Sequence, residues 1–181
     1  VRITSRDGAA VAPDGVSVHQ ADLKSGQGLV EAVAGVDTIV HAATALKAKK
    51  KVEVGGAGRL LEAIGDARPH LLYVSIVGVD RHPYSYYRAK WAAEQAVRDC
   101  GIEHVVLRPS FVFGTDGGVL PRFLRIARLS PVTPVIGPGT QRVQPIWIDD
   151  LVRAVRLAVE GDAVNGTVEV GGPQAVTWSE L

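Results

Sequence analysis

Cysteine is almost absent from this chain, which has one residue of that type, Cys100, and no methionine among 181 residues. A single thiol excludes an internal disulfide and a cysteine metal cluster, and it is typical of a reducing compartment, so we expect a cytoplasmic protein. The five histidines also lack the spacing of metal ligands. The sequence therefore predicts no metal site.

Long hydrophobic runs and a surplus of charge are missing too. No apolar run approaches the roughly 20 residues that a membrane span needs. The formal net charge is only +1, so no overall field favours nucleic acid or an anionic membrane. We expect a small-molecule substrate, with neither nucleic acid nor a membrane as partner.

Short apolar stretches and glycines alternate along the chain, which is 46% hydrophobic and contains 20 glycines. Strands are predicted over residues 1–5, 15–23, 37–43, 70–78, 103–110, 144–148 and 166–172. Helices are predicted over 54–64, 86–101, 119–129 and 149–161, and another begins at 177. This alternation indicates an α/β fold with a parallel sheet and right-handed crossovers.

Several residues carry signals for helix ends. Gly101 suits the end of the helix over 86–101, and Asp149 or Asp150 suits the start of the helix over 149–161. Thr177 and Glu180 have the spacing of a capping box.

Tyr86 and Lys90 are four residues apart, so a helix places both side chains on one face. A nearby ammonium favours the phenolate and lowers the pKa of a tyrosine, which can then exchange a proton with a carbonyl or an alcohol. The alternative is a surface lysine beside a half-buried tyrosine.

The segments YVSIVGVD, YYRAKWAAEQAV, VVLRPSFVFG, QPIWIDDLVRAV and VEVGGPQAVTWSEL resemble the extended and atypical short-chain dehydrogenase/reductases. The similarity extends over almost the whole chain. It points to the branch that contains NmrA-like proteins and the NADPH-binding accessory subunit of respiratory complex I. The resemblance implies a Rossmann-like, doubly wound parallel sheet and an NADP-dependent oxidoreductase that acts on a carbonyl or quinone-like substrate. One alternative is a non-catalytic NADP(H)-binding redox sensor or accessory subunit with a protein partner, and a weaker one is a sugar-nucleotide epimerase.

Two regions are expected on this basis. Residues 1–113 would form the dinucleotide-binding core, and residues 114–181 a smaller substrate-side region packed on it. In such a sheet a central strand with a glycine-rich turn comes first, and no such segment is present here. We expect it to precede Val1 in the natural protein, and we expect the chain to continue beyond Leu181.

The resemblance assigns the adenosine end of the cofactor to four residues. Ser5 and Arg6 would meet the ribose, and an arginine there favours the 2′-phosphate of NADP over NAD. Asp22 would accept a hydrogen bond from the adenine amine, and Leu23 would pack on the ring. The alternatives are a solvated loop cation for Arg6 and a turn or helix cap for Asp22.

The nicotinamide end is assigned to the ends of two strands. Ala42, Ala43 and Thr44 would let the dinucleotide approach the backbone, while the preceding His41 reads as a core histidine. Pro109 would bend the chain out of the sheet and leave Ser110 and Phe111 near the cofactor ring. In the implied mechanism Tyr86 is the general acid/base, and Lys90 lowers its pKa and holds the ribose.

Two positions depart from the family pattern. A serine or threonine that helps to hold the substrate carbonyl is replaced by Ile76, and Ser75 could substitute for it only if the register shifts. Glu53 stands where relatives often have asparagine. These departures favour the non-catalytic alternative, whereas the Tyr86 and Lys90 pair favours the enzyme.

Two further segments have simpler interpretations. The glycines at residues 55–58 lack the dinucleotide and P-loop patterns and are predicted to allow close packing of a helix. The lysines at 47, 49, 50 and 51 are either a solvated loop or a cationic lip over a phosphate-bearing ligand.

Overall fold

The computed structural model describes residues 1–44, 50–115, 138–161 and 165–180. The helix predicted over 119–129 and the lysines at 47 and 49 lie outside these ranges. Within them, no helix combines the length and the apolar character that a bilayer crossing requires.

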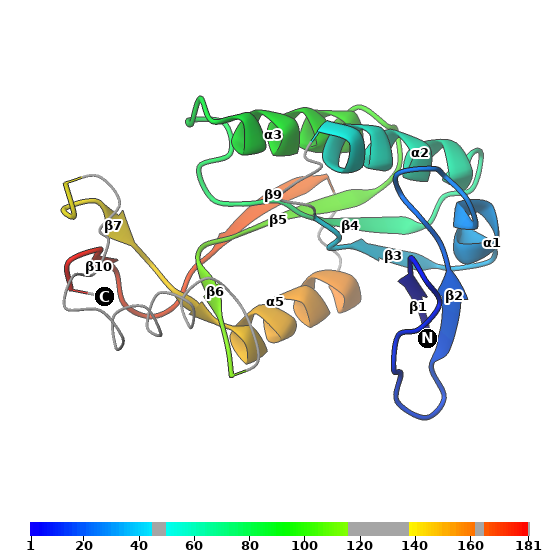
Figure 1. The fold of residues 1–181 in the computed structure, drawn as a ribbon, viewed down its shortest axis with the longest axis horizontal. Helices are drawn as coiled ribbons and strands as arrows, with labels where there is room; N and C mark the ends of the chain where they lie inside the picture. The colour runs from blue at the N-terminus through cyan, green and yellow to red at the C-terminus, as the bar shows by residue number, and fades with distance from the viewer. Residues whose placement is uncertain (45–49, 116–137, 162–164, 181) are drawn as a thin grey trace.

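A four-stranded parallel sheet forms the centre of the molecule, in the order β3-β4-β5-β9 (Figure 1). The strands are β3 (Thr38–His41), β4 (His70–Val74), β5 (His104–Pro109) and β9 (Gly166–Val170). Every residue of β5 is buried, as expected of an apolar strand with other layers on both faces. The predicted parallel α/β architecture is confirmed.

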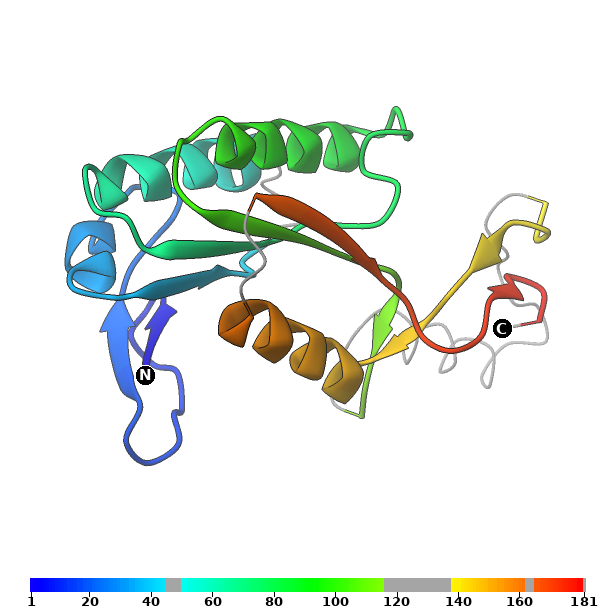
Figure 2. The same ribbon diagram turned by 180° about the vertical axis from the view of Figure 1, so that it is seen from behind.

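Helices cover both faces of this sheet. α2 (Gly55–Ile64) and α3 (Ser85–Arg98) lie on one face, and α5 (Ile148–Glu160) lies on the other (Figures 1 and 2). The main core joins the sheet to α2 and α3, and it contains Ala57, Leu60, Ile64, Leu71, Tyr73, Ala93, Val97, Ile102 and Val106.

α2 is preceded by one π-helical turn, η1 (Lys50–Val54). A Cβ atom on Gly56 would lie 3.1 Å from the Cβ of Leu23, so this glycine does allow close packing, as predicted. The short helix α1 (Leu29–Val33) packs on α2 and was not predicted, because its single turn is too short to show a helical period.

A separate parallel pair is formed by β1 (Arg2–Ser5) and β2 (Ser17–Gln20). In Figures 1 and 2 it stands on the β3 side of the molecule. Among the described residues, no backbone pairing joins β1 to β3. The central strand expected between them stays a prediction.

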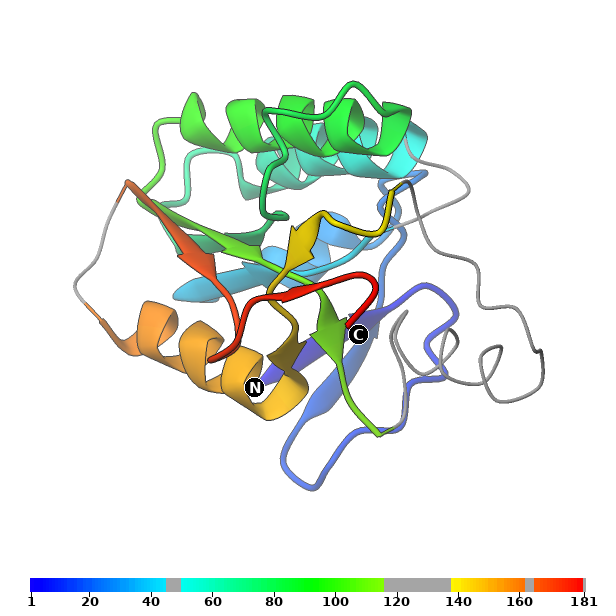
Figure 3. The same cartoon turned by 90° about the vertical axis from the view of Figure 1, so that its left-hand side faces the viewer.

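Four short strands lie beyond the carboxyl ends of β5 and β9 (Figures 1 and 3). β6 (Val112–Phe113) pairs with β8 (Ile146–Trp147), and β7 (Arg142–Val143) pairs with β10 (Val176–Thr177). An aromatic contact stabilises the β6–β8 pair, in which the ring centroids of Phe113 and Trp147 are 5.2 Å apart. β7, β8 and β10 belong to the region 114–181 predicted to form the substrate side, whereas β6 belongs to the predicted core 1–113.

Two predicted helix ends differ from the structure. α3 ends at Arg98 with Asp99 as its C-cap, and Gly101 instead occupies the following turn with φ of 71°. α5 begins at Ile148, because the extended backbone of Trp147 leads directly into it. Asp149 and Asp150 therefore lie inside the first turn and do not cap it.

The Thr177 and Glu180 pair makes the reciprocal hydrogen bonds of a capping box. The Thr177 backbone N–H donates to Glu180 Oε2 at 2.8 Å, and the Glu180 N–H donates to Thr177 Oγ1 at 3.2 Å. Residues 178–180 nevertheless form a turn, so the predicted helix is not present in the described residues.

Candidate active site

α3 begins at the carboxyl edge of the central sheet and carries Tyr86 and Lys90 in its first two turns. The predicted helix and its shared face are therefore confirmed. Tyr86 is half-buried, whereas Lys90 is only 3% exposed. An ammonium buried to this extent needs partners that compensate its charge.

Lys90 has these partners on two neighbouring elements. Its Nζ donates to the carbonyl oxygen of Val74 at 2.8 Å and lies 3.3 Å from Glu53 Oε2. The same nitrogen lies 5.0 Å from the centre of the Tyr73 ring. Burial lowers the pKa of Lys90, and the charge of Glu53 opposes that effect.

Tyr86 reaches the same carboxylate through a hydroxyl. Its phenolic oxygen lies 3.3 Å from Thr44 Oγ1, and Thr44 in turn donates to Glu53 Oε1. One connected polar cluster is thus formed by Tyr86 and Lys90 of α3, by Glu53 of η1 and by Thr44, which follows β3.

The predicted lowering of the Tyr86 pKa is wrong for this structure. Burial raises the pKa of Tyr86, the hydrogen bond to Thr44 opposes this, and the charge of Glu53 adds to the rise. The physical reason is that burial disfavours the charged phenolate. The ammonium of Lys90 is paired with Glu53 Oε2 at 3.3 Å.

The residues at the end of β3 lie where the sequence predicts them. Ala42, Ala43 and Thr44 are exposed at the carboxyl end of that strand. His41 is 6% exposed and packs on Tyr73 with 5.5 Å between the ring centres, as a core histidine. Burial lowers its pKa to about 4.

Ser75 does not join this cluster. It is buried, and its backbone N–H donates to the Leu107 carbonyl oxygen at 2.7 Å. Burial raises the pKa of Glu94, but hydrogen bonds from Arg108 and Arg98, together with the nearby Ser75 hydroxyl, outweigh it and leave that pKa lowered. Ser75 therefore faces Glu94, and no hydrogen bond joins it to Tyr86 among the described residues.

Pro109 is the last residue of β5, and the chain leaves the central sheet directly after it. Pro109 pairs with Val170 of β9. A proline at the end of a strand is tolerated because its missing N–H removes few hydrogen bonds from the sheet. The Ser110 N–H still donates to Val170 at 2.9 Å. Phe111 packs edge-on against Trp178 at 5.2 Å, which ties it to the C-terminal strands.

The residues assigned to the adenosine end are only partly available. Arg6 is exposed after β1, and the Ser5 hydroxyl donates to Asp7 Oδ1 at 2.7 Å. The Asp22 carboxylate accepts the Lys24 N–H at 2.9 Å and the Ser25 hydroxyl at 3.0 Å. Asp22 thus serves a turn, which was the alternative interpretation.

Leu23 is half-buried and packs against the core beneath α2. Its contact with Gly56 gives it a packing role in this structure, and its predicted contact with adenine stays a prediction.

The sequence did not predict the buried network around Arg108. This guanidinium on β5 meets Glu94 on α3, with 2.7 Å between Nη2 and Oε1. An available signal was the arginine inside the apolar run VVLRP, since a charge at a buried strand position requires a partner.

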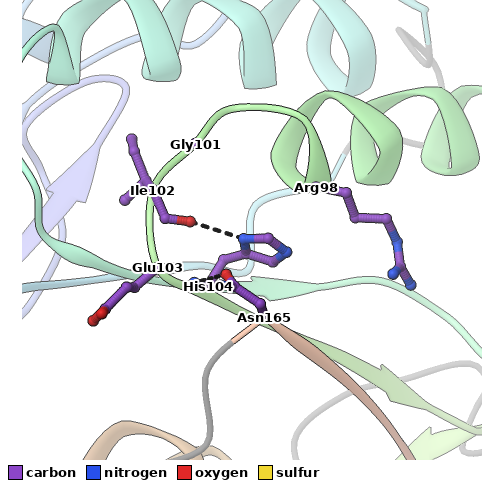
Figure 4. Close-up of a pocket in the computed structure, with 6 residues that line it drawn as sticks. All are labelled: Arg98, Gly101, Ile102, Glu103, His104 and Asn165. Carbon is purple, nitrogen blue, oxygen red and sulfur yellow. Dashed lines mark hydrogen bonds between the residues drawn. The ribbon is translucent and has the colours of Figure 1, made fainter.

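A cavity of about 360 Å³ lies at the opposite edge of the sheet, lined by Arg98, Gly101, Ile102, Glu103, His104 and Asn165 (Figure 4). His104 points Nδ1 at the Ile102 carbonyl oxygen, 2.9 Å away. The cavity is roughly 20 Å along α3 from Tyr86, at 1.5 Å per helical residue. Ligands of open parallel sheets bind at the carboxyl edge, so the cavity is distinct from the candidate site.

Residues 1–171 match the model of a family described as the NAD dependent epimerase/dehydratase family. The chain is 33% identical over 113 residues to an NADH dehydrogenase [ubiquinone] 1 alpha subcomplex subunit 9 of Arabidopsis thaliana, over 61% of this chain and 28% of that protein. It is 29% identical over 174 residues to a ceramide reductase of Caulobacter vibrioides, over 92% of this chain and 54% of that protein.

Among solved structures, a dTDP-glucose 4,6-dehydratase of Bacillus anthracis in complex with NAD superposes with a TM-score of 0.80 at 18% identity. The superposition covers 92% of this chain and 62% of the dehydratase. At that identity the similarity shows the fold, which confirms the Rossmann-like prediction. The chain spans about half the length of the ceramide reductase, and less of the plant subunit.

Proposed function

Because the chain belongs to the NAD dependent epimerase/dehydratase family, we propose that it is an oxidoreductase of the short-chain dehydrogenase/reductase type. It reduces a carbonyl or quinone-like substrate with a nicotinamide dinucleotide. The observation that supports this most strongly is the position of Tyr86, 3.3 Å from Thr44 at the carboxyl end of β3. Parallel sheets bind ligands at this edge.

The residues at this edge fit a dinucleotide. Ala42 and Ala43 are exposed, and their small side chains let a ligand approach the backbone. A nicotinamide bound beside them would supply the hydride. Tyr86 gives its proton to the carbonyl oxygen, since a tyrosine phenol carries its proton at neutral pH.

We propose NADP as the cofactor, because Arg6 is an exposed cation at the end of β1 and the fold directs that strand end toward the adenosine ribose. The family description and the dehydratase structure both name NAD. The preference therefore depends on Arg6 alone, and a direct comparison of the two cofactors decides it.

A non-catalytic dinucleotide-binding accessory subunit is the second candidate. The half-buried Ile76 and the buried Ser75 leave no hydroxyl beside Tyr86 from that segment, and a relative is a complex I subunit. In that case the cofactor is structural and the partner is another protein.

Two measurements on the full-length protein separate the candidates. Fluorescence titration with NADPH and NADH reports whether a dinucleotide binds. Oxidation of NADPH is then followed with a panel of aldehydes, ketones and quinones for the wild type and Tyr86→Phe. Binding with turnover that depends on Tyr86 supports the oxidoreductase, and binding without any turnover supports the accessory subunit.

A further inference from the structure

Three aromatic rings lie together at the start of α3. They belong to His82, Tyr84 and Tyr87, the last of which lies in the first turn of the helix. The centre of the His82 ring lies 4.8 Å from that of Tyr87, and the centre of the Tyr84 ring lies 6.3 Å from both. Aromatic rings attract one another at separations of about 4.5–7 Å. The three rings therefore form one surface, which we call the aromatic array.

The aromatic array is largely open to solvent. Tyr84 is 67% exposed, His82 is exposed and Tyr87 is half-buried. Single exposed apolar residues are common on protein surfaces and need no explanation, whereas a contiguous exposed patch marks a binding surface. The array is such a patch, and within the described ranges the hydrophobic core clusters contain none of its rings.

The aromatic array is continuous with the candidate site through Tyr86. The Tyr87 ring lies edge-on to the Tyr86 ring, with 5.9 Å between their centres. The hydroxyl of Tyr86 lies 3.3 Å from Thr44, which follows β3. As Figure 1 shows, α3 begins at the carboxyl edge of the sheet, where parallel sheets bind ligands. A substrate that presents its carbonyl oxygen to Tyr86 therefore has the array beside it.

Flat conjugated molecules complement such a surface. An aromatic ring has a negative face and a positive edge, so it attracts other π systems in offset-stacked or edge-to-face arrangements. Each such contact raises the affinity by about twofold to tenfold beyond the effect of apolar burial. The phenol ring of tyrosine is rich in electrons, and a carbonyl group conjugated with a ring withdraws electrons from that ring. A saturated ring or chain has no π face and gains only from burial.

We infer that the aromatic array binds the ring of the substrate, so that the carbonyl reduced at this site belongs to a flat conjugated ring compound, either a quinone or an aryl ketone. The inference rests on the proposed function and narrows its substrate class. As in that function, the carbonyl gains a hydride from reduced nicotinamide and a proton at its oxygen. Tyr84 and Tyr87 determine specificity through their rings and take no part in the bond changes.

Tyr84 is the member of the array that is best suited to a test. His82 also packs on the chain before it, because a Cβ atom on Gly78 would lie 3.3 Å from the His82 ring. Replacing His82 would therefore disturb the backbone of this segment as well as the array. Tyr84 is exposed, so its replacement changes the surface and leaves the core intact.

The test follows reduction of acetophenone and of cyclohexyl methyl ketone by the full-length protein with NADPH. These two methyl ketones differ in whether the ring is aromatic or saturated. Tyr84→Leu removes the aromatic ring, and Tyr84→Phe keeps it. Because conjugation also changes the reactivity of a carbonyl, the quantity compared is the effect of each variant on each ketone. A naphthoquinone forms a third arm, and the higher kcat/KM of this quinone or of acetophenone identifies which of the two classes the site prefers.

Tyr84→Leu is expected to lower kcat/KM for acetophenone by about fivefold, as the loss of one ring contact would. The same variant with cyclohexyl methyl ketone, and Tyr84→Phe with either ketone, should stay within about twofold of the wild type. Circular dichroism confirms that both variants keep the fold. A loss that is equal for the two ketones, or no loss with acetophenone, overturns the inference.

A failure of the proposed function is recognised separately. If no ketone or quinone is reduced, the oxidoreductase proposal is wrong, and equilibrium binding then tests the aromatic array alone. Binding of the naphthoquinone is measured by saturation-transfer NMR in the presence of NADP. Weaker binding to Tyr84→Leu than to Tyr84→Phe supports the array as the binding surface for a conjugated ring. Equal binding to the two variants, or no binding to the wild type, overturns it.

Discussion

Arg108 and Glu94 form a buried ion pair that joins β5 to α3, with 2.7 Å between Nη2 and Oε1. Glu94 is completely buried and also pairs with Arg98, with 2.8 Å between Arg98 Nη2 and Glu94 Oε1. Arg108 further stacks its guanidinium near the ring of Trp91, at 5.5 Å. The pair therefore fixes the helix that carries Tyr86 against the strand beneath it.

Removing one partner of this pair is expected to be costly. Arg108→Ala leaves the partly exposed Arg98 as the cation paired with Glu94 among the described residues, and we predict a loss of about 3 kcal/mol in the free energy of unfolding. The matched control is Arg156→Ala, which breaks an exposed pair with Glu160 and should cost less than about 1 kcal/mol. Urea unfolding followed by circular dichroism measures both, and equal losses would contradict this prediction.

The buried His41 is expected to make the free energy of unfolding depend on pH in the acid range. Burial lowers its pKa to about 4 in the folded chain, against about 6.5 in an unfolded one. Between these values the unfolded state binds more protons, so the free energy of unfolding falls as pH drops from about 6.5 to about 4.

The loss attributable to His41 is on the order of 3 kcal/mol by pH 4, and it is absent above about pH 7. His41→Phe should remove that part of the pH dependence. The check is urea unfolding of wild type and variant at neutral pH and at points down to pH 4. Parallel curves for the two proteins would rule out His41 as the cause.

Gly172 and Gly58 are expected to respond oppositely to the same substitution. A Cβ atom at Gly172 would clash with the Pro145 carbonyl oxygen, whereas nothing lies within 4 Å of one at Gly58 in α2. Gly172→Ala should therefore destabilise the protein by about 1 kcal/mol or more through overpacking. Gly58→Ala should stabilise it by up to about 1 kcal/mol through helix propensity. Melting curves that shift in the same direction would be inconsistent with this packing.

Arg6 provides the test of cofactor preference. If it meets the 2′-phosphate of NADP, Arg6→Ala should weaken NADPH binding by roughly tenfold, as loss of a charge-assisted contact would. NADH binding should hardly change. Parallel fluorescence titrations with the two cofactors measure this, and an equal effect on both would remove the basis for preferring NADP.

The sequence predicted the parallel sheet and most of its strands because buried strands are continuous apolar runs, which the alternating pattern reveals directly. It placed Tyr86 and Lys90 on one helical face because residues four apart in a helix point the same way. It failed where partners come from distant segments. Glu53 and Thr44 are nine residues apart, yet both meet α3, and no local pattern shows that contact.

The predicted lowering of the Tyr86 pKa was wrong because burial of the phenol, which no local pattern shows, raises that pKa, and the charge of Glu53 adds to the rise. Spacing on one helix showed the ammonium and the phenol but not the carboxylate that pairs with the ammonium. The capping predictions for Asp149 and Asp150 failed differently, because the strand β8 runs straight into α5 and leaves no residue of loop to cap.

The central claim is that Tyr86 delivers a proton to a carbonyl while a bound nicotinamide delivers a hydride. The most direct measurement uses NADPH labelled with deuterium at the transferable position of the nicotinamide and a ketone that the substrate panel identifies, with mass spectrometry of the alcohol. We predict one deuterium in the alcohol formed by the wild type, and no alcohol from Tyr86→Phe although it binds NADPH equally. Unlabelled alcohol, or labelled alcohol formed as fast by Tyr86→Phe, would contradict the claim.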